Sequence, residues 1–333
     1  MRSNPSVAAI IVNLNSEELL ERCLQALADQ TLKPARTIVV DNGSCDGSAD
    51  GAEERFPGVE VVRLRENAGF ARANNLAIER AEGCEWVALV NPDAFPEPSW
   101  LETLVEAAAA RPEYTFFASR LLDGQNGATL DGTGDFYHVS GWAWQRGHGQ
   151  RVGNADDPPA AEEVFAPCAA AALYRRDALQ EVGGFDESYF CYFEDIDLGF
   201  RLRLAGHRCL YVPEAVAAHR GAAIAGRESD FAVYHAHRNL VWTYVKDMPR
   251  GLLFLYLPHH LFVNALTLVW FSLRGHPRAI FRAKVDALRG LPDVVRARRR
   301  VQGLRRTRAA DVRRAMSRGV SGYVSAWRLA RGA

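Results

Sequence analysis

Short apolar runs alternate with amphipathic segments along the first hundred residues of the chain. Runs of four to six apolar residues are typical of strands buried in a sheet, and leucines at helical spacing are typical of crossover helices. We expect strands at 7–12, 37–40, 59–64 and 86–90 and helices at 19–27 and 69–81. This alternation predicts a mostly parallel α/β sheet, in which ligands bind beyond the carboxyl ends of the strands.

Turn and capping residues mark the ends of several predicted elements. Asn15 is followed three positions later by Glu18, a spacing typical of a capping box at a helix start. Further along, we expect a helix near Pro98, a long loop or hairpin region at 123–159, a short helix at 198–205 and a last strand at 209–212. Long loops inside compact domains usually have a function, so we expect the region 123–159 to help shape a binding site.

A second apolar segment lies near the C-terminus. The 22 residues 252–273 are mostly apolar, which is about the length of a helix that crosses a bilayer. Pro258, His259, His260 and Asn264 interrupt the segment, and polar side chains are costly in the middle of a membrane. We therefore expect a segment that lies in the membrane interface rather than one that spans it.

Charge is distributed unevenly along a chain that is neutral as a whole. Residues 274–333 contain 17 Lys and Arg against 3 Asp and Glu, a net charge of +14, so residues 1–273 carry a net charge of −14. Clustered basic residues bind anionic membrane surfaces with about 1 kcal/mol each. Few aromatic residues are present there to stack on bases, so we expect an anionic membrane surface and no nucleic acid as partner.

Composition places the chain in a reducing compartment. Its 333 residues are 48% hydrophobic, enough to bury a full core. The six cysteines are far apart and form no C-x-x-C pair, and the apolar run 7–12 is too short for the core of a signal peptide. We expect a cytoplasmic protein that associates with the inner face of the cell membrane.

Acidic side chains follow two of the predicted strands. Asp41 ends the second strand, and Asp93 follows the fourth strand after Asn91 and Pro92. Asp93, directly after a buried strand, is suited to hold Mg²⁺ or Mn²⁺, which in turn binds a diphosphate. Asp41 is suited to accept a hydrogen bond from the imide N–H of a pyrimidine base. Taken singly, both positions are more typical of turns that end a strand.

Three carboxylates crowd into four positions at Glu194, Asp195 and Asp197. Capping of a helix explains one or two of them, and a third indicates a metal site or carboxylates whose pKa values are tuned for catalysis. His219 is either a metal ligand or a structural histidine. Arg72, in the first turn of the helix after Gly69, is suited to contact a phosphate or ribose, or is an ordinary surface arginine.

Two common classes of nucleotide-binding enzyme are excluded. A nicotinamide-dependent dehydrogenase needs G-x-G-x-x-G between the first strand and helix, and the segment 13–16 contains no glycine. A P-loop is also absent from the sequence.

In their joint order, these segments resemble the family 2 inverting glycosyltransferases, and most of all the bacterial rhamnosyltransferase-type enzymes of cell-surface polysaccharide assembly. The resemblance covers about residues 7–221. The segments that carry it are Val12-Asn13-Leu14-Asn15-Ser16, Val39-Val40-Asp41-Asn42-Gly43-Ser44, Asn67-Ala68-Gly69-Phe70-Ala71-Arg72-Ala73-Asn74-Asn75, Asn91-Pro92-Asp93, Val182-Gly183-Gly184-Phe185-Asp186-Glu187 and Glu194-Asp195-Ile196-Asp197-Leu198.

The resemblance implies a GT-A fold and a role for each matched residue. Asp195 matches the general base, with Glu194 beside it, and Asp93 and His219 match ligands of Mg²⁺ or Mn²⁺. Asn91 stands where the family's D-x-D motif has its first Asp, so it supplies less charge to the metal. The nucleotide-sugar donor would be bound by Asn13, Asp41, Asn67, Arg72, Asn91 and Asp93.

The resemblance also implies a reaction and a division of the chain. We expect a GT-A catalytic domain over 1–225 and a helical, membrane-associating extension over 226–333. The expected reaction moves a sugar, L-rhamnose from dTDP-rhamnose, with inversion to a saccharide or lipid-linked saccharide acceptor. The alternative is a catalytically silent scaffold that binds glycans or the membrane.

Overall fold

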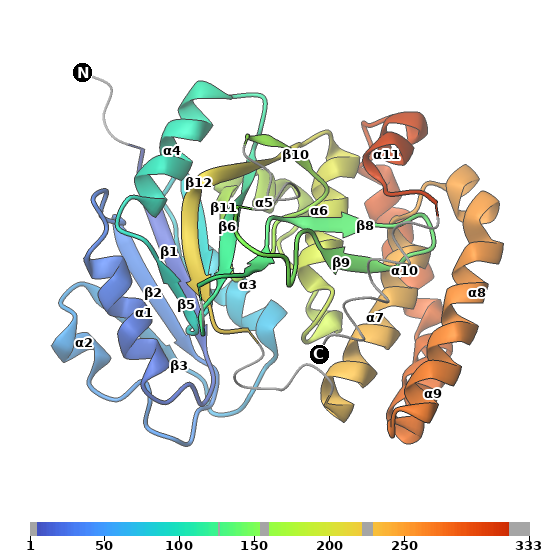
Figure 1. Ribbon diagram of the computed structural model, residues 1–333, viewed down its shortest axis with the longest axis horizontal. Coiled ribbons are helices and arrows are strands. Elements are labelled where there is room, and N and C mark those ends of the chain that lie inside the picture. Colours follow the sequence, from blue (N-terminus) through green and yellow to red (C-terminus); the bar gives the residue numbers. More distant parts are fainter. Residues whose placement is uncertain (1–4, 126, 154–159, 222–228, 320–333) are drawn as a thin grey trace.

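A ten-stranded sheet forms the centre of the computed structural model, which describes residues 5–125, 127–153, 160–221 and 229–319 (Figure 1). Its first half is parallel, with the strand order β4-β1-β2-β3. The strands are β1 (Val7–Asn13), β2 (Arg36–Asp41), β3 (Val59–Arg63) and β4 (Trp86–Val90). The crossover helices are α1 (Leu19–Ala28), α2 (Ala52–Arg55) and α3 (Phe70–Arg80). These elements confirm the alternation predicted from the apolar pattern.

The second half of the sheet is mixed. β11 (Ala171–Arg175) lies antiparallel between β4 and β6 (Phe116–Asp123), and β12 (Cys209–His219) pairs in parallel with β6. β12 is longer than the predicted strand 209–212, because it passes through an irregularity between Val212 and Val216 and continues to His219. Shorter strands are β5 (Ala94–Pro96), β7 (Leu130–Gly132) and β10 (Glu162–Val164), and a separate hairpin joins β8 (Asp135–Tyr137) to β9 (Ala143–Gln145).

Helices cover both faces of the sheet and form two apolar cores. Successive residues of β1 point to opposite faces, so Ala9 and Ile11 join one core while Ala8 and Ile10 join the other. The first core is closed by α1 and α4 (Trp100–Ala110), and the second by α3, α5 (Arg176–Val182) and α6 (Glu194–Ala205).

Two helix starts differ from the predictions. The capping box is wrong: α1 begins at Leu19 after Glu18, and no side chain caps it. Asn15 instead has a left-handed backbone, and its side-chain oxygen accepts a hydrogen bond from the Cys45 backbone at 2.8 Å. α6 begins at Glu194, four residues before the predicted helix, so the acidic cluster forms its first turn.

The helices after residue 229 pack on one end of the sheet, opposite α1 and α2 (Figure 1). They are α7 (Asp230–Asp247), α8 (Arg250–Leu273), α9 (Pro277–Arg289), α10 (Leu291–Gly303) and α11 (Ala309–Ala315). A third apolar core joins them to the preceding part of the chain, with Tyr137 and Phe200 on one side and Tyr244 and Leu252 on the other. The division at residue 225 stays a prediction, since the two parts share this core.

α8 is a single helix through the predicted apolar segment, with Pro258 inside it. By length and composition it is the one helix among the described residues that fits a membrane span. Its buried face includes His260, whose Nδ1 lies 2.8 Å from the Ser140 carbonyl oxygen. Asn264 accepts a hydrogen bond from Lys284 at 2.6 Å. Two of the three polar residues that interrupt the apolar segment, His260 and Asn264, therefore have hydrogen-bond partners in the protein, whereas His259 is exposed.

Gly199 in α6 provides a test of how closely this helix packs. A Cβ at Gly199 would lie 2.5 Å from the Cβ of Ala166. Replacing a helical glycine by alanine normally stabilises by about 0.5–1 kcal/mol, whereas overpacking costs about 1–3 kcal/mol. We expect Gly199→Ala to lower the free energy of unfolding in a urea titration. Gly303→Ala in α10, where nothing lies within 4 Å, is the matched control and should be neutral or stabilising. Equal behaviour of the two variants would contradict the close packing.

Candidate active site

A cavity of about 500 Å³ opens at the carboxyl ends of β1 and β4 and is closed on its far side by α6 and α7. Six of the nine predicted site residues line this cavity, together with Asn42. These seven residues come from five separate parts of the chain. They are Asn42, Asn67, Asn91, Asp93, Glu194, Asp195 and His219. Strand ends therefore bring distant polar side chains to one place, as expected for a sheet of this kind.

One wall of the cavity is a network of asparagines. Asn42 donates to the side-chain oxygen of Asn67 at 2.9 Å and accepts from the Ala68 backbone at 2.8 Å. Asn13 is fully buried beneath this wall, and its amide nitrogen lies 2.9 Å from Ser48 Oγ and 3.4 Å from Asp41 Oδ1. These contacts fix the shape of the loops after β1 and β2.

Asp93 and His219 face each other at the base of the cavity. β5 pairs with the end of β12 so that Ala94 lies opposite His219, which brings His219 Nε2 to 3.3 Å from Asp93 Oδ1. On its other side, His219 Nδ1 lies 2.7 Å from Asp131 Oδ2. Asp131 is 2% exposed and also binds His148. The imidazole is thus held between two carboxylates.

This arrangement shifts two pKa values. Burial opposes a charge on His219, but the hydrogen bonds to Asp131 and Asp93 outweigh it and raise the pKa of His219 to about 9. Burial likewise opposes a charge on Asp131, yet hydrogen bonds from His148 and His219 hold the pKa of Asp131 well below its ordinary value. A carboxylate that accepts from one ring nitrogen orients the other nitrogen, as in many metal-ligating histidines.

The donor set fits a hard divalent cation that is shared with a diphosphate. Among the described residues, no group of three or more His, Cys, Asp and Glu side chains forms a ready-made metal site. Mg²⁺ and its analogues are commonly held by one or two protein ligands, with substrate phosphates and water completing the shell. The Asp93 carboxylate matches that description. The His219 imidazole, whose pKa is raised, can join it once the cation displaces the ring proton, because only the neutral ring binds a metal.

Asp195 lies in the first turn of α6, partly exposed to the cavity. Burial by its surroundings raises the pKa of Asp195, although its carboxylate accepts from the Ile196 backbone at 2.8 Å. Burial and the charge of Asp195 also raise the pKa of Glu194 well above its ordinary value. A carboxylate whose pKa is raised is a stronger base, so Asp195 is suited to accept a proton.

Asp135 is a further carboxylate in the cavity that the sequence motifs did not indicate. It begins β8, is 5% exposed, and its pKa is raised well above its ordinary value by burial and then by the charges of Asp195 and Asp131. Both Asp131 and Asp135 belong to the region 123–159, for which we expected a functional role. The signal that could have found them is the repeated acidic-glycine pattern Asp131-Gly132-Thr133-Gly134-Asp135.

Another part of the cavity wall is aromatic. Its rings come from β9, from the loop before α6 and from the start of α7, and they are Trp144, Phe190, Tyr192, Phe193 and Phe231. This wall touches the loop that begins α3, because a Cβ at Gly69 would lie 2.6 Å from the Phe190 ring and the Ala71 backbone donates to the Phe190 carbonyl at 3.3 Å. The cavity thus has one polar and one aromatic side.

Three residues expected at the donor site do not line the cavity. Asn13 is buried, Asp41 is half-buried at the end of β2, and Arg72 is exposed on α3. Their roles stay predictions, as do those of the six predicted residues that do line it.

Comparison with known proteins gives a consistent result. The family model described as glycosyl transferase family 2 matches residues 8–183. The N-acetylglucosaminyl-diphospho-decaprenol L-rhamnosyltransferase of Mycobacterium tuberculosis is 32% identical over 237 residues, which cover 65% of this chain and 77% of that protein. The O-antigen biosynthesis protein RfbC of Myxococcus xanthus is 27% identical, over 93% of this chain and 24% of that protein.

Solved structures share the fold. GalNAc-T7 with UDP, GalNAc and Mn²⁺ has a TM-score of 0.61 and 14% identity over 75% of this chain and 49% of that chain. The mannosyltransferase PcManGT of Pyrobaculum calidifontis with GDP-Man and Mn²⁺ has a TM-score of 0.54 and 18% identity over 86% and 88%. The GT-A fold expected from the motifs is confirmed.

The family model covers more than half of the chain, and the mycobacterial rhamnosyltransferase aligns over most of its own length. The likeness to rhamnosyltransferases drawn from the motifs is therefore confirmed as well. On these grounds, the chain belongs to glycosyltransferase family 2.

Proposed function

We propose that this protein transfers L-rhamnose from dTDP-rhamnose, with inversion, to a saccharide on a lipid carrier at the inner face of the cell membrane. The observation that carries the proposal is the convergence of Asp93, His219 and Asp195 on one cavity, which also has a polar side for a nucleotide. The acceptor class is supported by the mycobacterial relative, whose name gives an N-acetylglucosaminyl-diphospho-decaprenol acceptor.

The proposed reaction is a single displacement. An acceptor hydroxyl attacks the anomeric carbon of the donor, the bond from that carbon to the diphosphate oxygen breaks, and the hydroxyl proton passes to Asp195. The raised pKa of Asp195 favours this transfer, because the carboxylate becomes a stronger base. Attack from the face opposite the leaving diphosphate gives the inverted product.

Asp93 and His219 would hold Mg²⁺ or Mn²⁺ together with the donor diphosphate. When bound, such a cation neutralises the negative charge that develops on the leaving group. Two structural neighbours of the same fold were crystallised with Mn²⁺, which supports this class of metal. Asp131 orients the imidazole so that Nε2 faces Asp93.

Membrane association is supported by the exposed side of α8 and α9. Their exposed apolar side chains are Phe254, Leu255, Leu257, Leu261, Phe262, Leu266, Val269, Leu273, Phe281 and Leu288. Next to Leu252, the side chains of Arg313, Arg314 and Arg318 line a second cavity of about 370 Å³. Apolar residues flanked by arginines fit the surface of an anionic membrane, in which the acyl chains take up the apolar groups and the headgroups bind the cations. The last residues of the basic segment lie outside the described part of the chain.

The catalytic role of Asp195 is tested by Asp195→Asn, which keeps the shape of the side chain but cannot accept the proton. Loss of a general base typically costs about 10²–10⁴ in rate, so transfer from dTDP-rhamnose to a prenyl-diphosphate-linked N-acetylglucosamine should fall by at least about 10². The affinity for dTDP, measured by calorimetry, should change little. An unchanged affinity would show that the donor site is intact in the variant. Near-full turnover of the variant would refute the assignment.

The same assay distinguishes an enzyme from a catalytically silent scaffold. Release of dTDP from dTDP-rhamnose by the unaltered protein is expected of an enzyme and not of a scaffold.

The metal site is tested by Asp93→Ala in dTDP titrations with and without Mn²⁺. Even indirect changes around a metal cost about 10–100-fold in metal affinity, so we expect the tightening of dTDP binding by Mn²⁺ to be lost. Asp177→Ala, at an exposed carboxylate of α5 paired with Arg175, is the control and should behave as the unaltered protein. Equal Mn²⁺ dependence in both variants would contradict the proposed site.

The membrane surface is tested by co-sedimentation with vesicles. The double variant Leu261→Glu and Phe262→Glu places two charges on the exposed side of α8, where the native side chains are 59% and 64% exposed. We expect the unaltered protein to bind vesicles that contain phosphatidylglycerol, and the double variant to bind at least tenfold less. Val152→Glu, at an exposed valine outside α8 and α9, is the control. Unchanged binding of the double variant would remove α8 as the docking surface.

A further inference from the structure

The loop that leads into α6 has an unusual backbone. Phe190, Tyr192 and Phe193 all have positive φ angles, of 66°, 64° and 68°. Bulky residues rarely adopt this conformation, and each such residue costs about 1–3 kcal/mol unless its surroundings hold it. The three aromatic side chains line the cavity, and Phe193 is directly followed by Glu194 and Asp195. The strain is therefore located next to the proposed catalytic base.

Asn239 of α7 holds this loop through its backbone. The side chain is fully buried, and its amide nitrogen lies 3.0 Å from the Tyr189 carbonyl, 2.9 Å from that of Cys191 and 2.7 Å from that of Tyr192. Its oxygen accepts from Arg238 Nε at 2.9 Å. One amide group thus contacts three carbonyls of the loop. Replacing it would remove this donor from the carbonyls of Cys191 and Tyr192, whereas the Tyr189 carbonyl also accepts from Arg238 Nη2 and from the Cys191 backbone, both within 2.9 Å.

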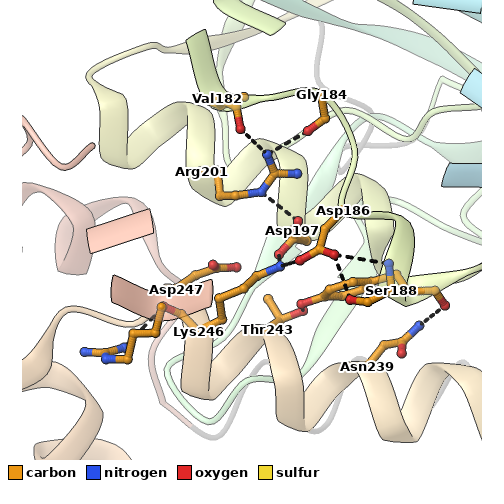
Figure 2. A network of polar contacts seen from close by, with 12 residues as sticks. Val182, Gly184, Asp186, Ser188, Asp197, Arg201, Asn239, Thr243, Lys246 and Asp247 are labelled. Carbon is orange, nitrogen blue, oxygen red and sulfur yellow. Dashed lines mark hydrogen bonds and ion pairs between the residues drawn. The ribbon is translucent and has the colours of Figure 1, made fainter. Parts of the chain in front are cut away.

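Two further residues on the same face of α7 fasten the loop (Figure 2). Thr243 Oγ1 lies 2.9 Å from the Tyr189 hydroxyl. Lys246 is buried and forms ion pairs with Asp186 at the start of the loop and, at 2.5 Å, with Asp197 of α6. Positions 239, 243 and 246 recur at helical spacing, so one helix face makes all of these contacts.

The network is anchored in turn to the body of the protein. Arg201 donates to Asp197 at 2.8 Å and to the Val182 and Gly184 carbonyls at 2.9 Å and 2.7 Å, as Figure 2 shows. Asp186 also accepts from the Ser188 backbone at 3.1 Å, which caps the short helix that opens the loop. Both ends of the loop are therefore fixed, and Asn239 binds the backbone carbonyls of its strained middle part.

We propose that Asn239 is a positioning residue for the transfer reaction. It holds the backbone of residues 189–192 in the conformation that presents the rings of Phe190, Tyr192 and Phe193 to the acceptor sugar. Aromatic faces pack against the apolar faces of sugars, so the shape of this wall determines how well the acceptor hydroxyl reaches Asp195. This inference rests on the proposed function, since it assigns the aromatic side of the same cavity to the acceptor.

Asn239→Asp tests the proposal, because the carboxylate has the same shape but no N–H donor. We expect the KM for prenyl-diphosphate-linked N-acetylglucosamine to rise at least tenfold and kcat to fall, while the Kd for dTDP changes less than threefold. Thr243→Val removes one contact on the same face and should raise that KM by a smaller factor. Hydrogen exchange of residues 189–194 should become faster in Asn239→Asp.

Gln302→Glu is the matched control. The Gln302 amide of α10 donates to the carbonyls of Lys246 and Asp247 at 3.3 Å and 2.8 Å, so the change removes the same kind of contact away from the cavity. We expect its KM for the acceptor and its exchange at 189–194 to match the unaltered protein. If both variants change stability and kinetics alike, Asn239 has only a structural role and the inference is overturned. If the unaltered protein transfers no sugar, the proposed function is wrong, and the inference that rests on it is wrong as well. A Thr243→Val variant that matches the unaltered protein also counts against the inference if Asn239→Asp does not fold.

Discussion

The buried ammonium group of Lys246 constrains how the two ends of this chain fit together. It lies between the carboxylates of Asp186 and Asp197, and burial of the lysine is offset by those charges together with Asp247. Removing one partner from such a pair typically costs about 3–5 kcal/mol, since an uncompensated charge remains buried. Helix α7 is therefore bound to α6, and α6 carries Asp195. The C-terminal helices determine where the proposed base lies, in addition to forming an apolar surface.

The opposite side of the cavity depends on strand pairing. The irregularity in β12 lets that strand continue past Val216 and pair with β5, and this register sets His219 beside Asp93. A polar group at the end of a buried strand needs partners, and here the partners are other strand-end residues. The proposed reactive groups thus lie on two parts of the structure, Asp93 and His219 on the sheet and Asp195 on the packed helices.

Local patterns were sufficient to predict the first half of the fold. The strands 7–12, 37–40, 59–64 and 86–90 are apolar because helices cover both faces of the sheet, and that burial is visible in any short window of sequence. The joint order of the motifs identified the family, and most of the residues it marked share one cavity. The capping box failed because the Asn15 side chain binds Cys45, thirty positions away, and this partner depends on tertiary structure.

Contacts between distant residues explain what the sequence did not reveal. Asp131 binds His219 across 88 positions, and no spacing rule connects them. His260 and Asn264 interrupt an apolar segment, yet their partners are Ser140 and Lys284, so hydropathy alone does not reveal that they face the protein. The role of Asn239 is equally hidden, because the carbonyls it binds belong to a loop about 50 residues earlier.

Gly69 has no side chain, and this has a consequence for how two loops of the cavity can move. The Phe190 ring occupies the space that a Cβ would need, so the loop that begins α3 and the aromatic wall are in direct contact. Loops in such close contact cannot move independently, so a displacement at the start of α3 is passed on to the aromatic wall. A side chain larger than hydrogen at position 69 would force the two loops apart and widen the cavity between them.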